Sequence, residues 1–210
     1  MNQKTDGLIF DLDGTLWDST QAVADAWQAS ISKLDYVDRT VTQEDVRAIA
    51  GMPYDAIYDK LFPSLDKSQR QELMDLCAEE ELRHLKAEGG YLYDGLEETL
   101  SYLQDKKYKL FIVSNCQVGY IDIFLEYHNM QRFFTDHGCF GDFHKPKGEN
   151  IKDIIQRNNL QAAVYVGDTK GDYEASRQAG VPFIYARYGF GEVATDVPSI
   201  DQLADLRKLF

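Results

Sequence analysis

Short apolar runs alternate with amphipathic helical patterns over most of the chain. Each run ends in polar residues or glycine, as a buried parallel strand does where it enters a loop. The runs lie at residues 8–10, 109–113, 162–166 and 182–186. Between them, apolar residues recur at helical spacing near residues 96–103, 118–125 and 151–155. Because helices that connect parallel strands cover both faces of the sheet, this pattern predicts an α/β fold with a doubly wound parallel sheet.

The segment from residue 18 to residue 88 breaks this alternation. It contains no convincing strand, but apolar residues recur at helical spacing near residues 22–31 and along residues 69–85. Gly89-Gly90 marks the return to the alternating pattern. We therefore expect a helical domain inserted after the first strand. The predicted division is an α/β core at residues 1–17 and 89–210, with the inserted domain at residues 18–88.

Two features inside the predicted insertion have simple structural interpretations. Gly51-Met52-Pro53 is typical of a loop between two helices. The run Glu79-Glu80-Glu81 is interpreted as a solvated helix face.

Composition limits the classes of function. The 210 residues include 22 Lys+Arg against 35 Asp+Glu, which gives a net charge of −13. Without a basic cluster, this balance argues against nucleic acid and anionic membranes as partners. No apolar run approaches the roughly 20 residues of a membrane span, and the N-terminus lacks a signal-type apolar region, so we expect a cytoplasmic protein. Three cysteines in no metal-like spacing are expected to be free and buried.

Chemically reactive side chains follow the predicted strands. In a doubly wound sheet, ligands bind where the strands end. These side chains occur in four short groups of residues. Each group alone can be interpreted as a turn or a helix cap, but the four groups together, in their order along the chain, favour one shared site. The four groups are Asp11-Leu12-Asp13-Gly14-Thr15-Leu16, Ser114-Asn115, Lys145-Pro146-Lys147 and Gly167-Asp168-Thr169-Lys170-Gly171-Asp172.

These four groups match the four motifs of the haloacid dehalogenase-like hydrolase superfamily. The chain resembles in particular the phosphoglycolate-phosphatase-like branch, which has a helical (C1-type) cap, and the resemblance covers nearly the whole chain. It implies a Rossmann-like core, a cap at the position of the insertion, and a Mg²⁺-dependent phosphatase that acts through an aspartyl-phosphate. It also places substrate-contacting residues near Gly51-Met52-Pro53-Tyr54, and it implies a small phosphorylated metabolite as substrate.

The reacting residues follow from this resemblance and from the chemistry of phosphate esters. A phosphate monoester is a dianion, so a carboxylate nucleophile needs positive charge beside it. Asp11 is the expected nucleophile, and Asp13 is the expected acid that protonates the leaving oxygen and later activates water. An aspartate at position 13 argues against a dehalogenase, whose leaving halide needs no proton. The expected catalytic lysine is Lys147, with Lys145 as the alternative.

The resemblance also implies the ligands of the cation and of the phosphate. For Mg²⁺ it implies Asp11, Asp13 through its backbone carbonyl, Asp168, and Asp172 either as a ligand or close by. For the substrate phosphate, the expected residues are Gly14, Thr15, Ser114 and Asn115, because a helix start offers free N–H groups to an anion.

Three alternatives remain open from the sequence. A sugar-phosphate mutase or other phosphotransferase of the same superfamily would share the Asp11 and Asp13 chemistry. A non-catalytic regulatory or binding protein could use the same fold, although none of the expected carboxylates is missing. A receiver-type signalling domain is disfavoured because it lacks an insertion of this size. The protein is expected to be a monomer or a homodimer.

Overall fold

A six-stranded parallel sheet forms the centre of the molecule. The structure is a computed structural model, and it describes residues 5–52, 54–194 and 196–210. The strand order is β5-β4-β1-β6-β7-β8, and every neighbouring pair is parallel. The strands are β1 (Gly7–Phe10), β4 (Lys109–Ser114), β5 (Asp136–Cys139), β6 (Ala163–Gly167), β7 (Phe183–Ala186) and β8 (Ser199–Ile200).

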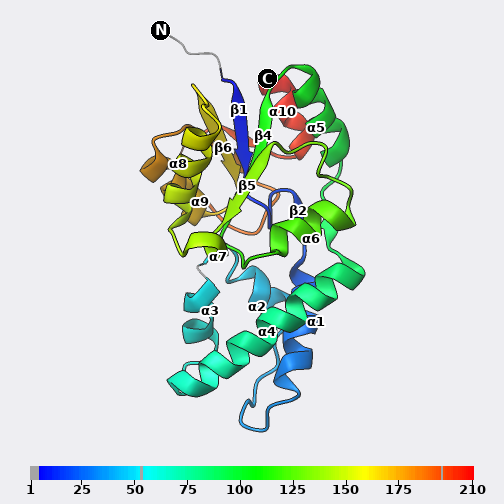
Figure 1. Cartoon of the computed structure of the whole chain (residues 1–210), viewed down its shortest axis with the longest axis vertical. Coiled ribbons are helices and arrows are strands. Elements are labelled where there is room, and N and C mark those ends of the chain that lie inside the picture. The colour runs from blue at the N-terminus through cyan, green and yellow to red at the C-terminus, as the bar shows by residue number, and fades with distance from the viewer. Residues whose placement is uncertain (1–4, 53, 195) are drawn as a thin grey trace.

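Helices cover both faces of this sheet, so alternate residues of each central strand enter different apolar clusters. In β1, Leu8 and Phe10 belong to one cluster and Ile9 to the other. Figure 1 shows α8 and α9 on one side of the sheet, and α5 and α10 on the opposite side. The helices of the core are α5 (Leu96–Asp105), α6 (Tyr120–Tyr127), α7 (Phe140–Phe143), α8 (Lys147–Arg157), α9 (Lys170–Ala179), the 3₁₀ turn η1 (Leu203–Asp205) and α10 (Leu206–Leu209).

Four further helices lie beyond the carboxyl ends of the strands, in the lower half of Figure 1. They are α1 (Thr20–Ile31), α2 (Gln43–Arg47), α3 (Tyr54–Leu61) and α4 (Lys67–Glu88). The long helix α4 begins at a capping box, in which the side chains of Asp66 and Gln69 each accept the other's backbone N–H. Helix α1 packs along α4, where the Ser30 hydroxyl donates to the Leu76 carbonyl. These helices occupy the segment for which the sequence predicts an insertion.

A short antiparallel ladder carries the chain into and out of these helices. It pairs β2 (Trp17–Asp18) with β3 (Tyr91–Leu92), so only two residues of each strand are paired. The Trp17 ring is fully buried and contacts the rings of Tyr120 and Phe124 edge to face. The connection is therefore narrow but anchored in the core.

The predicted α/β fold is confirmed, and the four predicted strands lie within one residue of β1, β4, β6 and β7. Strands β5 and β8 were not predicted. The reason is physical: β5 reads Asp-His-Gly-Cys without an apolar run, and both are edge strands, so fewer of their side chains need burial. Of the predicted loop at Gly51-Met52-Pro53, Pro53 lies outside the described residues.

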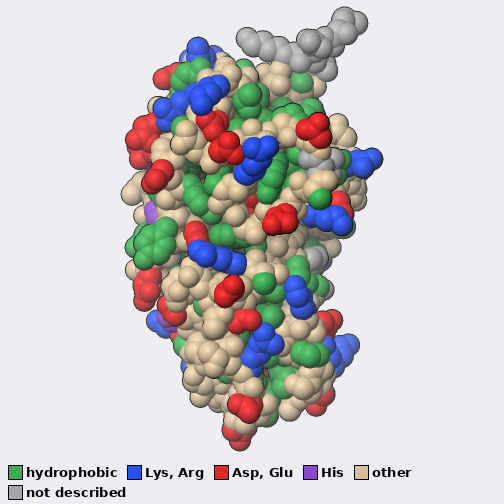
Figure 2. Space-filling view, turned by 180° about the vertical axis from the view of Figure 1, so that it is seen from behind, with side chains coloured by type: hydrophobic (Ala, Val, Ile, Leu, Met, Phe, Trp, Pro, Cys, Tyr) green, Lys and Arg blue, Asp and Glu red, His purple; other side chains and the backbone are tan. Residues whose placement is uncertain are grey.

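The surface and the cysteines have the properties that the composition predicts. On the face shown in Figure 2, acidic and basic side chains are interspersed, with no continuous basic area. Across the described part of the chain, no helix has both the length and the apolar character needed to span a membrane. All three cysteines are buried and free, as predicted.

Candidate active site

The carboxyl ends of β4, β1 and β6 bring the predicted residues to one place. Asp11 follows β1, Ser114 ends β4 and Asp168 follows β6. These three strands are neighbours in the sheet and run in the same direction, so their ends lie side by side. All three side chains are buried. The topology therefore assembles the site from distant parts of the sequence.

A buried acidic cluster and one lysine form the centre of this site. One oxygen each from Asp11, Asp168 and Asp172 lie within 4.8 Å of one another. The Lys147 ammonium is 3.0 Å from Asp11 Oδ1 and 2.6 Å from Asp172 Oδ1, and its side chain is only 4% exposed. Lys147 thus bridges two of the three carboxylates.

Asp172 has both of its oxygens occupied by protein donors. Oδ2 accepts from the backbone N–H and the hydroxyl of Thr169, at 2.9 and 2.7 Å. Oδ1 accepts from Lys147 and, at 3.3 Å, from the Tyr165 hydroxyl. The Thr169 side chain in turn accepts the Asp172 N–H, which is the capping box that starts α9. A local helix start therefore fixes Asp172, and Asp172 fixes Lys147.

The buried site has more acidic than basic side chains, and this imbalance shifts their pKa values. Burial, followed by repulsion from Asp172, raises the pKa of Asp11 to about 7 against the attraction of Lys147. Burial and the same repulsion raise the pKa of Asp168 well above its usual range. Burial lowers the pKa of Lys147, but attraction to Asp11 and Asp172 outweighs it and raises that pKa, so the lysine stays charged. One ammonium does not balance three buried carboxylates.

The donor set fits a divalent cation. Asp11 Oδ1 is buried and accepts no well-oriented hydrogen bond from the described residues, although the Lys147 ammonium lies close by. Asp168 Oδ2 accepts the Phe190 N–H at 2.7 Å, whereas Oδ1 has only the Thr15 hydroxyl at 3.4 Å. Oxygen-only ligands suit a hard cation such as Mg²⁺. Asp11 and Asp168 are the side chains with free acceptor capacity.

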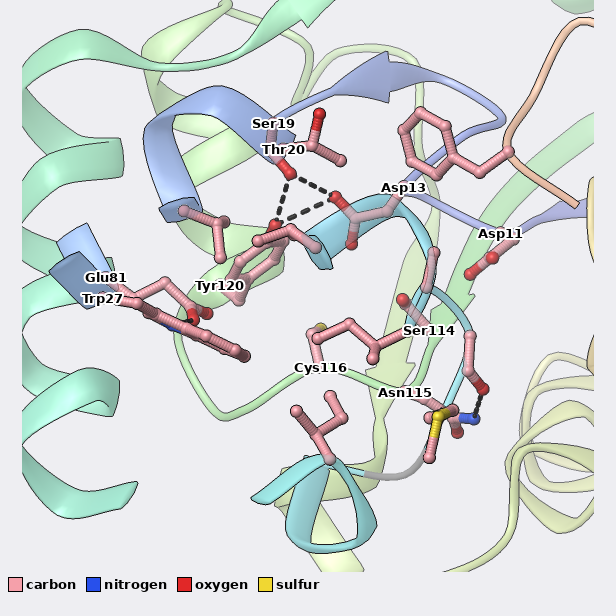
Figure 3. Close-up of a pocket in the computed structure, with 18 residues that line it drawn as sticks. Asp11, Asp13, Ser19, Thr20, Trp27, Glu81, Ser114, Asn115, Cys116 and Tyr120 are labelled. Atoms are coloured by element: carbon pink, nitrogen blue, oxygen red, sulfur yellow. Dashed lines mark hydrogen bonds between the residues drawn. The ribbon is translucent and has the colours of Figure 1, made fainter. Parts of the chain in front are cut away.

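Asp13 faces away from this cluster, toward the start of α1. Its Oδ1 accepts from Ser19 Oγ at 2.7 Å and from the Tyr120 hydroxyl at 2.9 Å (Figure 3). It also accepts from Trp17 Nε1 at 2.9 Å. None of the hydrogen bonds among the described residues goes to Oδ2. Burial raises the pKa of Asp13, although the hydrogen bonds from Ser19 and Tyr120 act against the rise. Asp13 therefore favours its protonated form more than an ordinary aspartate does.

Three residues predicted to belong to the site, Lys145, Gly14 and Thr15, contact carboxylates and do not line the cavity described next. The Lys145 ammonium pairs with Asp153 at 2.6 Å and is 45% exposed, so Lys147 is the lysine of the cluster. Gly14, with φ of 80°, turns the main chain against Asp168, and an added Cβ would lie 2.2 Å from its Oδ2. The Thr15 hydroxyl also points to Asp168. Gly14 and Thr15 support a carboxylate and do not line the cavity described next.

A cavity of about 90 Å³ lies between the core and helices α1–α4. Its size suits a small molecule, since one water needs about 10–15 Å³. The predicted residues Ser114 and Asn115 line it, and the Asn115 side chain donates to the Gly51 carbonyl at 2.9 Å, which ties the α2–α3 loop to the core. The other lining residues are Asp11, Asp13, Ser19, Thr20, Val23, Trp27, Val46, Ile49, Ala50, Gly51, Met52, Ile57, Glu81, Cys116, Tyr120 and Phe190.

Glu81 corrects the prediction of a solvated glutamate run. It is 3% exposed, accepts the Trp27 indole N–H at 2.6 Å and accepts the Gln117 amide at 3.0 Å. The sequence contains a signal for this burial that the prediction of a solvated run did not use. The buried residues of α4 are Leu73, Cys77, Glu81 and Leu85, which are four positions apart and therefore lie on one face of the helix. Tyr120, the hydroxyl donor to Asp13, was also missed.

The fold and the site together define a class: α/β proteins that hold a buried cluster of carboxylates and a lysine at the strand ends. The sequence model of the haloacid dehalogenase-like hydrolase family matches residues 8–186. The chain belongs to this family, and the resemblance stated from its motifs is confirmed. It is therefore an enzyme, a hydrolase.

Curated relatives agree with this assignment, and a solved structure shares the fold. The chain is 28% identical over 206 residues to a phosphoglycolate phosphatase of Agrobacterium fabrum, covering 94% of this chain and 85% of the relative. It is also 28% identical over 193 residues to one of Vibrio parahaemolyticus, covering 87% and 84%. In fold it is similar to CbbY from Rhodobacter sphaeroides in complex with phosphate, with a TM-score of 0.79, 17% identity, and coverage of 97% of this chain and 96% of that one.

Proposed function

We propose that this hydrolase is a phosphatase that releases inorganic phosphate from a small phosphate monoester through a phosphorylated Asp11. The observation that carries the proposal is the buried Lys147 ammonium, which bridges Asp11 and Asp172 beside Asp168. Such a group stabilises the charge that develops on a transferring phosphoryl group. The names of the curated relatives support the same activity.

The first step is attack by an Asp11 carboxylate oxygen on phosphorus. The bond from phosphorus to the ester oxygen breaks, and Asp13 gives its proton to that oxygen as the alcohol leaves. The raised pKa of Asp13 favours the protonated form that this step requires, and no hydrogen bond among the described residues occupies Oδ2, the oxygen that would carry the proton.

The second step returns Asp11 to its carboxylate form. Water attacks phosphorus and gives a proton to Asp13, and the bond from phosphorus to Asp11 breaks, which releases phosphate. Ser114 and the Asn115 backbone N–H would hold the phosphoryl oxygens, since they lie at the carboxyl end of β4, next to the strand that Asp11 follows. The same two carboxylates thus serve both steps.

A bound divalent cation, Mg²⁺ in our proposal, would screen the repulsion between Asp11 and the phosphate dianion. Asp11, Asp168 and the backbone carbonyl of Asp13 are the groups that would hold it. Asp172 acts by positioning Lys147, because both of its oxygens already have protein donors.

Residues 18–88 act as a cap over this site in the proposal. The β2–β3 ladder, with two residues paired on each side, provides the hinge. The hydrogen bond from the Asn115 side chain to the Gly51 carbonyl is a second contact between this segment and the core. Closure excludes water before phosphoryl transfer, and reopening releases the products.

The test is phosphate release from a panel of small phosphate esters and 4-nitrophenyl phosphate, with Mg²⁺ or with EDTA. We expect release only with Mg²⁺, and a loss of about a thousandfold or more in Asp11→Asn. Asp105→Asn, an exposed aspartate on α5, is the matched control and should keep full activity. Conversion of a sugar phosphate without release of phosphate would point to a phosphotransferase. Neither reaction, in a folded sample with Mg²⁺, would overturn the proposal.

A further inference from the structure

The cavity has a second acidic end, away from Asp11. Figure 3 shows Glu81 and Trp27 across the cavity from Asp11, with Tyr120 between them and Asp13. Glu81 belongs to α4 and Trp27 to α1, so this end is built by the helical segment. It lies where the alcohol part of a phosphate ester would extend when its phosphate sits at Asp11.

Glu81 has acceptor capacity to spare. A carboxylate offers about four acceptor positions, and each Glu81 oxygen receives one donor, from Trp27 and Gln117. Burial, with a smaller contribution from the charge of Asp13, raises the pKa of Glu81 to about 7 despite these two hydrogen bonds. Its negative charge is therefore poorly compensated by the protein alone.

Cationic side chains are missing from this cavity. Among the described residues that line it there is no lysine, arginine or histidine. Arg47 packs over the Phe190 ring at the wall, at 5.8 Å from the ring centroid, but its guanidinium is held by Asp18 at 2.7 Å. A carboxylate on the alcohol part of the substrate would be buried beside Glu81 without a counter-charge, which is costly.

We propose that Glu81 is a specificity residue that accepts a hydrogen bond from a hydroxyl or ammonium group of the leaving alcohol and excludes alcohols with a second anionic group. A charge-assisted hydrogen bond of this kind strengthens binding where water is excluded. The inference rests on the proposed phosphatase function, and it separates this chain from phosphoglycolate, the substrate for which its relatives are named.

Three two-carbon phosphate esters that differ only in their far group test this directly: 2-hydroxyethyl phosphate, 2-aminoethyl phosphate and phosphoglycolate. In the wild type with Mg²⁺, we expect kcat/KM for the hydroxyl or amino ester to exceed that for phosphoglycolate at least about tenfold. Comparable or faster hydrolysis of phosphoglycolate would overturn the inference without any variant.

Variants separate specificity from a structural role. Glu81→Gln removes the charge at nearly constant volume, and it should shrink the preference over phosphoglycolate about tenfold. Glu79→Gln removes a charge from an exposed position of the same helix and should leave the preference unchanged. A merely structural Glu81 would lower all three rates together, and an unchanged ratio in Glu81→Gln would overturn the inference.

The aryl ester distinguishes the two proposals. If 4-nitrophenyl phosphate is hydrolysed with Mg²⁺ but phosphoglycolate is preferred among the two-carbon esters, only the role of Glu81 fails. If no ester is hydrolysed, the proposed function fails and the inference fails with it.

Discussion

The two ends of the cavity are acidic in different ways. At the phosphate end, Asp11 and Asp172 share the ammonium of Lys147, and all three come from the strand-end side of the core. At the other end, Glu81 has only neutral donors, one from α1 and one from the loop before α6. The first end holds part of its counter-charge in Lys147, whereas the second has no cationic side chain among the described residues that line the cavity.

This difference separates reaction from recognition. At the phosphate end each reacting group is held by another, as Thr169 holds Asp172 and Asp172 holds Lys147. The Glu81 end depends on how two helices pack, so single substitutions there change the character of the cavity without disturbing the reacting groups. Variants at the two ends should therefore have different signatures.

The largest effect among these variants is expected from the lysine of the phosphate end. Lys147→Ala should lower kcat by about a hundredfold to a thousandfold, because it removes the positive charge beside Asp11. Lys145→Ala should stay within about threefold, since its ammonium pairs with Asp153 near the surface. Steady-state kinetics on one ester compare the two variants. Equal losses in the two variants would contradict the proposal that Lys147, and not Lys145, is the catalytic lysine.

A smaller effect, on stability, is expected at the Glu81 end. Because its pKa is raised from 4.5 to about 7 in the folded protein, the folded state binds more protons than the unfolded state between these values. The contribution of Glu81 to the free energy of unfolding should therefore fall as pH rises through this window, by up to about 3 kcal/mol. Glu81→Gln should remove this contribution and leave that of Asp11, whose pKa is also raised to about 7.

Urea unfolding at pH 5 and pH 8 measures this effect, with Glu79→Gln as the control for an exposed glutamate. The comparison uses only the change in the free energy of unfolding between the two pH values, because the substitution also alters hydrogen bonds whose contribution does not depend on pH. Parallel pH profiles for the wild type and Glu81→Gln would contradict a buried, uncompensated charge.

The smallest effect is expected at Asp13, which lies between the two ends. Tyr120→Phe removes one of three donors to Asp13 Oδ1 and leaves those from Ser19 and Trp17. We expect kcat to fall about fivefold to tenfold with little change in KM, the effect of one hydrogen bond. Tyr127→Phe, on the exposed side of the same helix, is the control. A change in KM with kcat unchanged would show that Tyr120 does not contribute to the chemical step.

The phosphate end could be predicted because its residues follow apolar strands, and strand ends in a parallel sheet converge. Asp11, Ser114 and Asp168 needed only the strand positions and the sheet class. The choice between Lys145 and Lys147 needed the helix: Lys147 begins α8 and is directed inward, whereas Lys145 precedes Pro146 and reaches Asp153.

The other end could not be predicted in the same way. Glu81 stands in a run of three glutamates, and although its spacing from Leu73, Cys77 and Leu85 indicates the buried face of α4, it does not indicate which side chain Glu81 contacts. Its partner Trp27 is 54 positions away, and no motif joins the two. Contacts between helices that are distant in the sequence are harder to predict from the sequence than an aspartate at the end of an apolar strand.

The indole groups give this molecule its own optical readout. The chain has two tryptophans, and each donates its N–H to a carboxylate of the cavity, Trp17 to Asp13 and Trp27 to Glu81. The emission of Trp17 should therefore respond to the charge of Asp13, and that of Trp27 to the charge of Glu81. Replacing either tryptophan with phenylalanine would leave a single reporter, so that ligand arrival at one end and protonation at the other could be followed separately, in real time and without a label.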